Sequence, residues 1–427
     1  MRLNIPPLNM EPLKRLPLRI TALTTAVAVL VPALLVLLVP RRLASGLDRL
    51  LPEAALLQSF PARPGSAPPP LWQQRLGPQQ AAELWRRQRR LWWQFWGPHG
   101  DAGAYLVFAA PPSTPLPADA LRVDDLLVVA PSPLARQLLQ QQLRLRRRPS
   151  RGLNQRCSEA LMQREAVHWT GTALAQMLGP LSPLALSLQQ GCLLLSSEGS
   201  ALLWQGEAEA SRDSLQPAPA RLAIPAALPR SGATLLELRG RRLELLLRGL
   251  LSTALLRNAL AERYGLGPEQ LRRLQGAPFV LQLQPQAAGT WRAGLSLLVR
   301  LPGERQLWER WLADLSRALE QQGLAPSQPG GGVTLWGRED GTSVGGWRWL
   351  KPDQLLLFLG PSPGSTANLD GSAGSADWQL SLSPAALQAA QLLPPGLPLV
   401  VQRSQALLLQ GRAAAGSTAL SGRLELR

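Results

Sequence analysis

Residues 126–133 read LLVVAPSP, and residues 356–363 read LLFLGPSP. Each copy is a short apolar run that stops at a proline, which is the pattern of a buried strand ending in a turn. A helical pattern containing Leu-Trp precedes each copy, at 84–85 and at 307–308. The recurrence of these features in one order predicts a tandem repeat.

The segments that follow the two copies also correspond. After the first copy come Trp169, a helix starting after Thr172 and apolar strands interrupted by proline. After the second copy come Trp378, a helix starting after Ser383 and again strands interrupted by proline. Ser and Thr are favoured at helix N-caps, so both helix starts have a physical basis. We therefore predict an α+β fold with two related α+β units and mainly antiparallel sheets.

Composition places boundaries between these units. Four prolines between residues 215 and 231 mark a linker, and a second proline-rich stretch ends near residue 70. The predicted segments are an N-terminal tail (1–19), a transmembrane helix (20–39), a juxtamembrane segment with a proline-rich linker (40–70), a first α+β unit (71–214), a linker (215–231) and a second α+β unit (232–427).

The N-terminal region contains the longest apolar run, ITALTTAVAVLVPALLVLLV at Ile20–Val39. Twenty helical residues span roughly 30 Å, the thickness of a bilayer core. A buried soluble helix and a cleaved signal peptide are the alternatives. The run is longer than a signal-peptide core, and Arg41 and Arg42 stand where a cleavage site would begin. We predict an uncleaved signal anchor, kinked at Pro32.

Orientation of this span is less strongly encoded, because basic residues flank it almost equally on both sides. A short tail before a first apolar helix and a long domain after it place the N-terminus inside, since long domains translocate largely regardless of charge. We predict a single-pass membrane protein whose soluble domain lies outside the cytoplasm.

The chain carries a formal net charge of +17 with 45 basic residues, nearly all of them arginine. A GC-rich genome explains this bias without selection for a polyanionic partner. A basic surface near the span would also attract anionic lipid headgroups. Ordinary solvation of a charged surface is an equally good interpretation.

The two cysteines, Cys157 and Cys192, leave two alternatives open. They form a disulfide if their Cα atoms come within roughly 4–7 Å, which an oxidising compartment would permit. Otherwise they are two unrelated buried thiols.

No pattern in the sequence supports catalysis. Gly-x-Ser-x-Gly occurs at 341–345 and 360–364, but neither copy has the strand, turn and helix that a nucleophile elbow needs. With His99 and His168 as the only histidines, no usual zinc cluster can form, and there is no phosphate-binding loop. The pair Asp124-Asp125 fits a solvated turn. We predict no enzymatic activity, no cofactor and no metal.

The segment most like a binding site is LWRRQRRLWWQFW at 84–96, within a helix predicted over 78–96. Interleaved arginine and tryptophan suit a membrane interface or single-stranded nucleic acid. They also fit a helix whose tryptophans pack on a sheet while its arginines face solvent. The candidate patch comprises Trp85, Arg86, Arg87, Arg89, Arg90, Trp92, Trp93 and Trp96.

Several segments resemble a known family. They are the N-terminal anchor, PRSGATLLEL at Pro229–Leu238, the leucine-rich helix after it and GAPFV at Gly276–Val280. Together they resemble an uncharacterised family of membrane-anchored cyanobacterial proteins with a conserved domain of unknown function. The resemblance covers chiefly the second half and implies a plasma or thylakoid membrane protein. It implies no activity, cofactor or catalytic residue.

These observations lead to one main functional hypothesis. We expect a non-enzymatic, membrane-tethered binding or scaffold module that takes a protein or an apolar ligand. Its expected partners are the lipid bilayer, anionic lipid headgroups and another membrane or envelope protein. The alternative is a cytoplasm-facing polyanion binder that uses segment 84–96, with nucleic acid the less favoured partner.

Overall fold

The computed structural model describes residues 44–426 apart from short gaps at 99–102, 146–149, 174–187, 211–233, 245, 248–253, 287–291, 304, 364–368, 370–375, 394–401 and 415–416. Residues Ser45–Arg427 form one compact unit. The predicted tail, the predicted span at Ile20–Val39 and the predicted linker at 215–231 lie outside the described residues.

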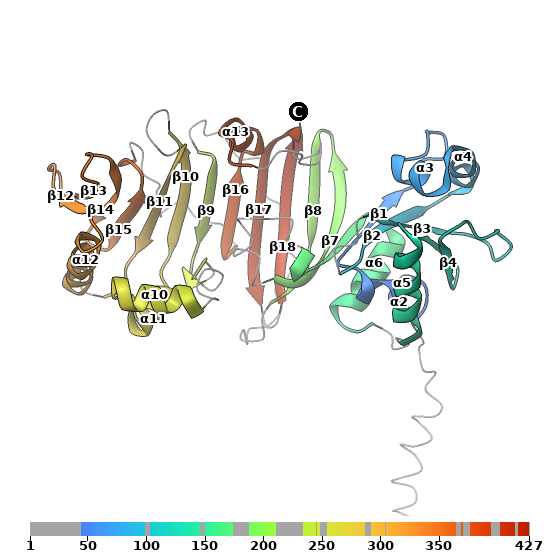
Figure 1. Cartoon of the computed structure of the whole chain (residues 1–427), viewed down its shortest axis with the longest axis horizontal. Helices are drawn as coiled ribbons and strands as arrows, with labels where there is room; N and C mark the ends of the chain where they lie inside the picture. The colour runs from blue at the N-terminus through green and yellow to red at the C-terminus, as the bar shows by residue number, and fades with distance from the viewer. Residues whose placement is uncertain are drawn as a thin grey trace, which may run out of the picture. The chain divides into compact units, whose positions relative to one another are not determined.

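Eighteen strands of the described chain form one antiparallel sheet (Figure 1). Each strand pairs with its neighbours in an order that differs from the order along the chain. From one edge to the other, the strands are β4 (Ala120–Val123), β5 (Leu126–Val129), β3 (Tyr105–Ala109), β2 (Leu91–Trp96), β1 (Leu56–Pro61), β6 (Ala166–Thr170), β7 (Leu188–Glu198), β8 (Ala201–Ala210), β18 (Ser417–Leu426), β17 (Ser404–Ala414), β16 (Trp378–Leu382), β9 (Leu236–Gly240), β10 (Phe279–Pro285), β11 (Ala293–Arg300), β15 (Gln354–Leu359), β14 (Ser343–Lys351), β13 (Val333–Gly337) and β12 (Ala325–Ser327).

Helices cover parts of this sheet and its rims (Figure 1). In chain order, those described are α2 (Leu47–Leu50), the 3-10 turn η1 (Leu51–Glu53), α3 (Pro70–Leu76), α4 (Pro78–Arg87), α5 (Pro133–Leu145), α6 (Leu153–Gln163), α10 (Ala254–Tyr264), α11 (Pro268–Gln275), α12 (Arg305–Glu320) and α13 (Pro384–Ala389).

The strand order repeats on either side of one seam, where β8 pairs with β18. Outward from the seam, the first half runs β8, β7, β6, β1, β2, β3, β5, β4. The second half runs β18, β17, β16, β9, β10, β11, β15, β14, and then adds β13 and β12. We use first half for β1–β8 and second half for β9–β18. The seam register is symmetric, because Ala201 pairs with Glu425 and Glu209 pairs with Ser417.

This arrangement corrects the predicted fold class. Two related α+β units with mainly antiparallel sheets were predicted, whereas the described strands of both halves belong to a single antiparallel sheet. The reason lies in the last hairpin of each half, β7–β8 and β17–β18, whose outer strands each leave a row of backbone N–H and C=O groups unpaired within that half. Pairing these two edges with each other satisfies both rows.

The first half has helices on both faces of its strands. In β2, successive side chains alternate, so Trp92 packs with α3 and α4 while Trp93 and Phe95 pack with α2, α5 and α6. Trp72 of α3 is fully buried against Trp92 and against Phe108 of β3, with ring centroids 6.0 and 4.7 Å apart. The result is a three-layer arrangement with a core on each side of the sheet.

The second half has its large core on one face. Trp308, Leu312 and Leu315 of α12 recur at helical spacing and pack with residues of β9, β10, β11, β13, β14 and β15. The opposite face has a smaller cluster around Leu298, Leu356 and Phe358, and its described members come from strands and one loop. Further along this face the side chains are polar.

The predicted localisation also needs correction. Among the described residues, no helix is both long enough and apolar enough to cross a bilayer. The longest described helix, α12, has polar residues along one side and uses its apolar side in the core. The prediction of a single-pass plasma or thylakoid membrane protein is therefore withdrawn.

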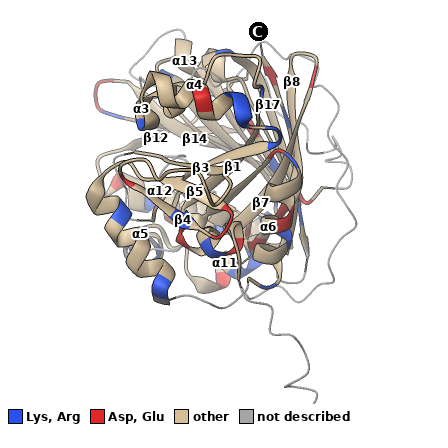
Figure 2. Ribbon diagram, turned by 90° about the vertical axis from the view of Figure 1, so that its right-hand side faces the viewer, with Lys and Arg blue, Asp and Glu red and all other residues tan. Residues whose placement is uncertain are grey.

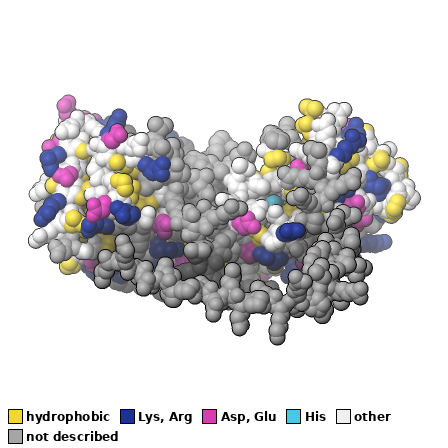
Figure 3. Space-filling view, turned by 90° about the horizontal axis from the view of Figure 1, so that it is seen from below, with side chains coloured by type: hydrophobic (Ala, Val, Ile, Leu, Met, Phe, Trp, Pro, Cys, Tyr) yellow, Lys and Arg dark blue, Asp and Glu magenta, His cyan; other side chains and the backbone are white. Residues whose placement is uncertain are grey.

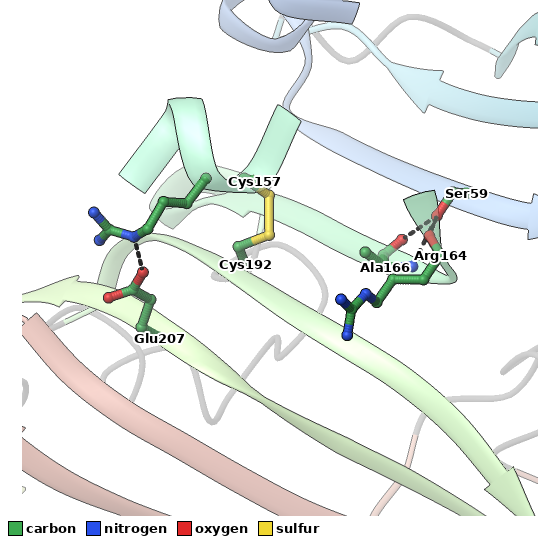
Figure 4. The surroundings of a disulfide bond; sticks show 7 residues. Ser59, Cys157, Arg164, Ala166, Cys192 and Glu207 are labelled. Carbon is green, nitrogen blue, oxygen red and sulfur yellow. Dashed lines mark hydrogen bonds and ion pairs between the residues drawn. A yellow bond between two sulfur atoms is a disulfide. The ribbon is translucent and has the colours of Figure 1, made fainter. Parts of the chain in front are cut away.

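Of the two alternatives for the cysteines, the structure contains the disulfide. Cys157 of α6 and Cys192 of β7 are bonded, with their Cα atoms 5.7 Å apart (Figure 4). Arg156 next to Cys157 donates from Nε to Glu207 Oε1 on β8 at 2.6 Å. The disulfide and the ion pair together fix α6 onto β7 and β8.

Candidate binding groove

The predicted Arg/Trp patch does not form one surface. Helix α4 ends at Arg87, and 91–96 are strand β2 rather than helix. Trp85, Trp92 and Trp93 are buried in the two cores, whereas the four arginines between residues 86 and 90 are exposed. The prediction of a helix over 78–96 is wrong because the dense aromatic run favours a strand with both faces buried.

Hydrogen bonds confirm the packing role of these tryptophans. Trp85 Nε1 donates to the carbonyl oxygens of Arg63 and Ser66 at 3.1 and 3.0 Å. Trp93 Nε1 donates to the Leu161 carbonyl oxygen at 2.8 Å. Trp96 is partly buried at the end of β2. Aromatic faces that are covered in this way cannot stack on nucleotide bases.

A different group of arginines lines a cavity of about 360 Å³ between β4 and α5. All four residues of β4 line the cavity. Because successive side chains of a strand point to opposite faces, the cavity runs along the outer edge of β4. Among the described strands, β4 pairs with β5 alone. We call this cavity the β4/α5 groove.

The local sequence explains the positions of the two walls of the groove, strand β4 and helix α5. Asp124 has a positive φ of 55° in the two-residue turn between β4 and β5, and its Oδ2 accepts from the Gly46 N–H at 2.7 Å. Helix α5 starts at Pro133, and the Ser132 hydroxyl accepts from the Ala135 N–H at 3.2 Å. The turn and the helix start thus fix the strand and the helix next to each other.

Helix α5 presents two different stripes. Ala135, Leu139 and Leu143 enter the core. Arg136, Gln140 and Arg144 recur every four residues and therefore share the flank that lines the groove. Figure 2 shows basic residues in blue on α5 beside β4.

Two further arginines complete the groove, and each is held by the protein. Arg49 of α2 donates to Asp124 Oδ1 at 3.4 Å and to the Leu143 carbonyl oxygen at 3.3 Å. Arg122 of β4 donates to the carbonyl oxygens of Ala110 and Thr114 at 3.1 and 3.0 Å. These contacts fix Arg49 and Arg122 as positive charges in the wall.

The remaining two arginines are less fully engaged. Arg136 Nε lies 4.0 Å from Asp119 Oδ1, and this buried Nε has no hydrogen-bond partner among the described residues. Arg144 is exposed. Arg49 pairs with Asp124 and Arg136 lies beside Asp119, whereas Arg122 and Arg144 form no ion pair with a described residue.

The side chains that line the groove suit a ligand that has both an anionic group and an apolar group. Guanidinium groups bind carboxylate or phosphate in a planar, two-point geometry. Leu116, Leu121 and Leu143 add apolar lining. Among the described residues that line the groove there is no histidine, cysteine, serine or acid.

Charge elsewhere on the unit is more evenly mixed. Figure 3 shows basic and acidic side chains interspersed at the left-hand end, where α10–α12 lie. Many are paired within one helix, as Arg273 with Glu269 at 2.6 Å and Arg305 with Glu309 at 2.7 Å. The groove differs because its basic residues come from α2, β4 and α5 and converge on one cavity.

The residues considered for catalysis are not brought together. Ser343 begins strand β14, and strand rather than helix follows it. His168 is buried in β6, where burial lowers its pKa to about 4. Asp124-Asp125 form the β4–β5 turn, and His99 lies outside the described residues. Within the described chain, no group of three metal-ligating side chains occurs.

No protein-family model, curated protein or solved structure matches this chain. The resemblance to the membrane-anchored cyanobacterial family therefore stays a prediction. The functional argument rests on the geometry of the groove.

Part of the groove was visible in the sequence. Arg136, Gln140 and Arg144 stand four residues apart, and this spacing is readable without a structure. Arg49 and Arg122 are not, because they reach the groove from segments far apart in the chain. Tertiary pairing of β4 with β5 was required to place them.

Proposed function

We propose that this chain is a binding or scaffold module without catalytic activity of its own, and that an anionic segment of a protein partner binds in the β4/α5 groove. The supporting observation is the convergence of four arginines on one cavity, two of which, Arg122 and Arg144, form no ion pair with a described residue. A surplus of fixed positive charge in a partly buried cavity favours an anion over water.

Several features support a protein partner over nucleic acid. Of the tryptophans that would stack on bases, Trp85, Trp92 and Trp93 are buried and Trp96 is partly buried. The groove is short, with walls built from one four-residue strand and one flank of α5. A short cavity with apolar residues between charges suits a few peptide side chains better than a long phosphate backbone.

Selection of peptides on the full-length chain tests this function. A phage-displayed library of random dodecapeptides would be selected on the wild type, and the enriched peptides measured by fluorescence anisotropy. We expect acidic peptides that lose about thirtyfold or more in affinity for the variant Arg136→Glu/Arg144→Glu, because two charge-assisted contacts become repulsive.

A matched control separates groove recognition from a general effect of charge. Arg86→Glu/Arg310→Glu makes the same change of charge on two exposed helical arginines of α4 and α12. Affinity there should stay within about twofold of wild type. Failure to enrich any peptide, or an equal loss in both double variants, would contradict the proposed function.

A further inference from the structure

We infer that the partner segment binds as an added β-strand on the outer edge of β4, with acidic side chains at positions i and i+4. This inference deepens the proposed function and rests on it. It identifies the ligand class as an extended acidic peptide rather than any anion that fits the cavity.

The backbone of β4 is prepared for such pairing. The Ala130 N–H donates to the Asp119 carbonyl oxygen at 3.0 Å, which fixes the alternation of inward and outward groups along the strand. By this alternation, Leu121 and Val123 exchange hydrogen bonds with β5. The N–H and C=O of Arg122 then point to the outer edge, where the groove lies.

Spacing on α5 matches the spacing on an added strand. Arg136 and Arg144 are eight helical residues apart, or about 12 Å, with Gln140 midway. Side chains at i, i+2 and i+4 of a strand share one face and span about 13 Å. Acids at i and i+4 can therefore meet Arg136 and Arg144, with a polar side chain at i+2 facing Gln140.

The two edges of the sheet differ in the way this inference requires. At the far edge, β12 contains Pro326, which lacks an N–H, and all three of its residues are exposed. Proline on an edge strand discourages pairing with other chains. β4 has no proline and lies beside a positively charged wall.

A peptide series on the wild-type, full-length chain tests strand addition directly. The probe is the fluorescein-labelled heptapeptide TEVQVET, which has acids at its second and sixth positions. Two derivatives carry N-methyl groups on alternate residues, one on the odd set and one on the even set. A strand pairs with one edge through every second N–H, so one derivative should lose roughly tenfold in affinity and the other should stay within about threefold.

Charge and spacing are tested with two more peptides. TQVQVQT removes both acids and should bind at least about tenfold more weakly, and TEVEVQT moves the second acid out of reach of the second arginine and should also weaken binding. Each of these losses should disappear in Arg136→Glu/Arg144→Glu and persist in Arg86→Glu/Arg310→Glu.

The outcomes separate the two levels of the proposal. If both methylated peptides bind like TEVQVET while charge dependence remains, strand addition is overturned and the groove is an anion site without backbone pairing. Displacement of TEVQVET by a single-stranded dodecanucleotide at equal concentration would also overturn it. If no acidic peptide depends on Arg136 and Arg144, the proposed function fails as well.

Discussion

The two halves of the sheet share one strand order but differ in what covers them. First-half strands such as β3 and β5 are buried on both faces, with α3 and α4 on one side and α2, α5 and α6 on the other. In the second half, helices pack on one face, and β10 has Phe279 on that face while Gln282 and Gln284 point to the other. Strand order alone therefore does not determine layering; the side chains on each face do.

The polar face of the second half is built from pairs of neighbouring strands. Gln282 Nε2 donates to Glu237 Oε2 at 2.6 Å, and Arg239 forms an ion pair with the same glutamate. Near the seam, Gln410 Nε2 donates to the Ser421 hydroxyl at 3.1 Å. These bonds satisfy polar groups that are largely shielded by their neighbours, so this part of the face is ordered by polar contacts.

The largest expected effect concerns the double core of the first half. Trp72→Ala should lower the free energy of unfolding by about 3–5 kcal/mol, because the ring fills the space between α3, α4 and β2. Urea unfolding monitored by circular dichroism would measure this. Leu307→Ala, at an exposed position of α12, is the control and should lower the free energy of unfolding by about 0.5 kcal/mol or less. An equally small loss of stability for Trp72→Ala would contradict a packed core between the sheet and helices α3 and α4.

A second prediction concerns the disulfide, which lies in the first half. Removing it in Cys157→Ala/Cys192→Ala frees a loop of 35 residues and should cost about 4 kcal/mol. Amide hydrogen exchange should quicken in α6 and β7 and stay unchanged in β10, β11 and β15. Uniform acceleration across both halves would show that the two halves unfold as one unit.

A third prediction is a pH dependence that originates in the first half. The pKa of His168 is lowered to about 4 by burial, from 6.5 in an exposed histidine. The unfolded chain therefore binds more protons between these values, so stability is full above pH 6.5 and falls as pH decreases toward 4. We expect wild type to lose about 2–3 kcal/mol more than His168→Leu between pH 7 and pH 4. Parallel pH curves for the two proteins would refute this role.

The smallest effect is expected on the polar face of the second half. Glu237→Gln keeps the shape of the side chain but removes its charge, and should cost about 1 kcal/mol through weaker bonds to Arg239 and Gln282. Glu83→Gln breaks an exposed pair with Arg87 and should cost about 0.5 kcal/mol or less. Thermal denaturation at matched pH would rank the two.

The sequence predicts the positions of single strands and helices better than it predicts how the strands pair. The apolar run that opens segment 126–133 is β5, and the helical pattern predicted around 307–308 lies in α12, because each follows a single clear period. Pairing of β8 with β18 was not predictable, since it joins edges about 200 residues apart whose local patterns carry no mark of each other. The prediction for segment 84–96 was wrong because the helical pattern of α4 was extended into the aromatic run at 91–96, which favours a strand with both faces buried.

Amide hydrogen exchange of the full-length chain with and without TEVQVET tests the central claim most directly, because the two edges of the sheet serve as site and control in one sample. Strand addition in the groove predicts slower exchange at 120–123 and along α5, with no change at Ala325–Ser327 of β12. Protection at β12, or at neither edge under saturating peptide, would contradict the account.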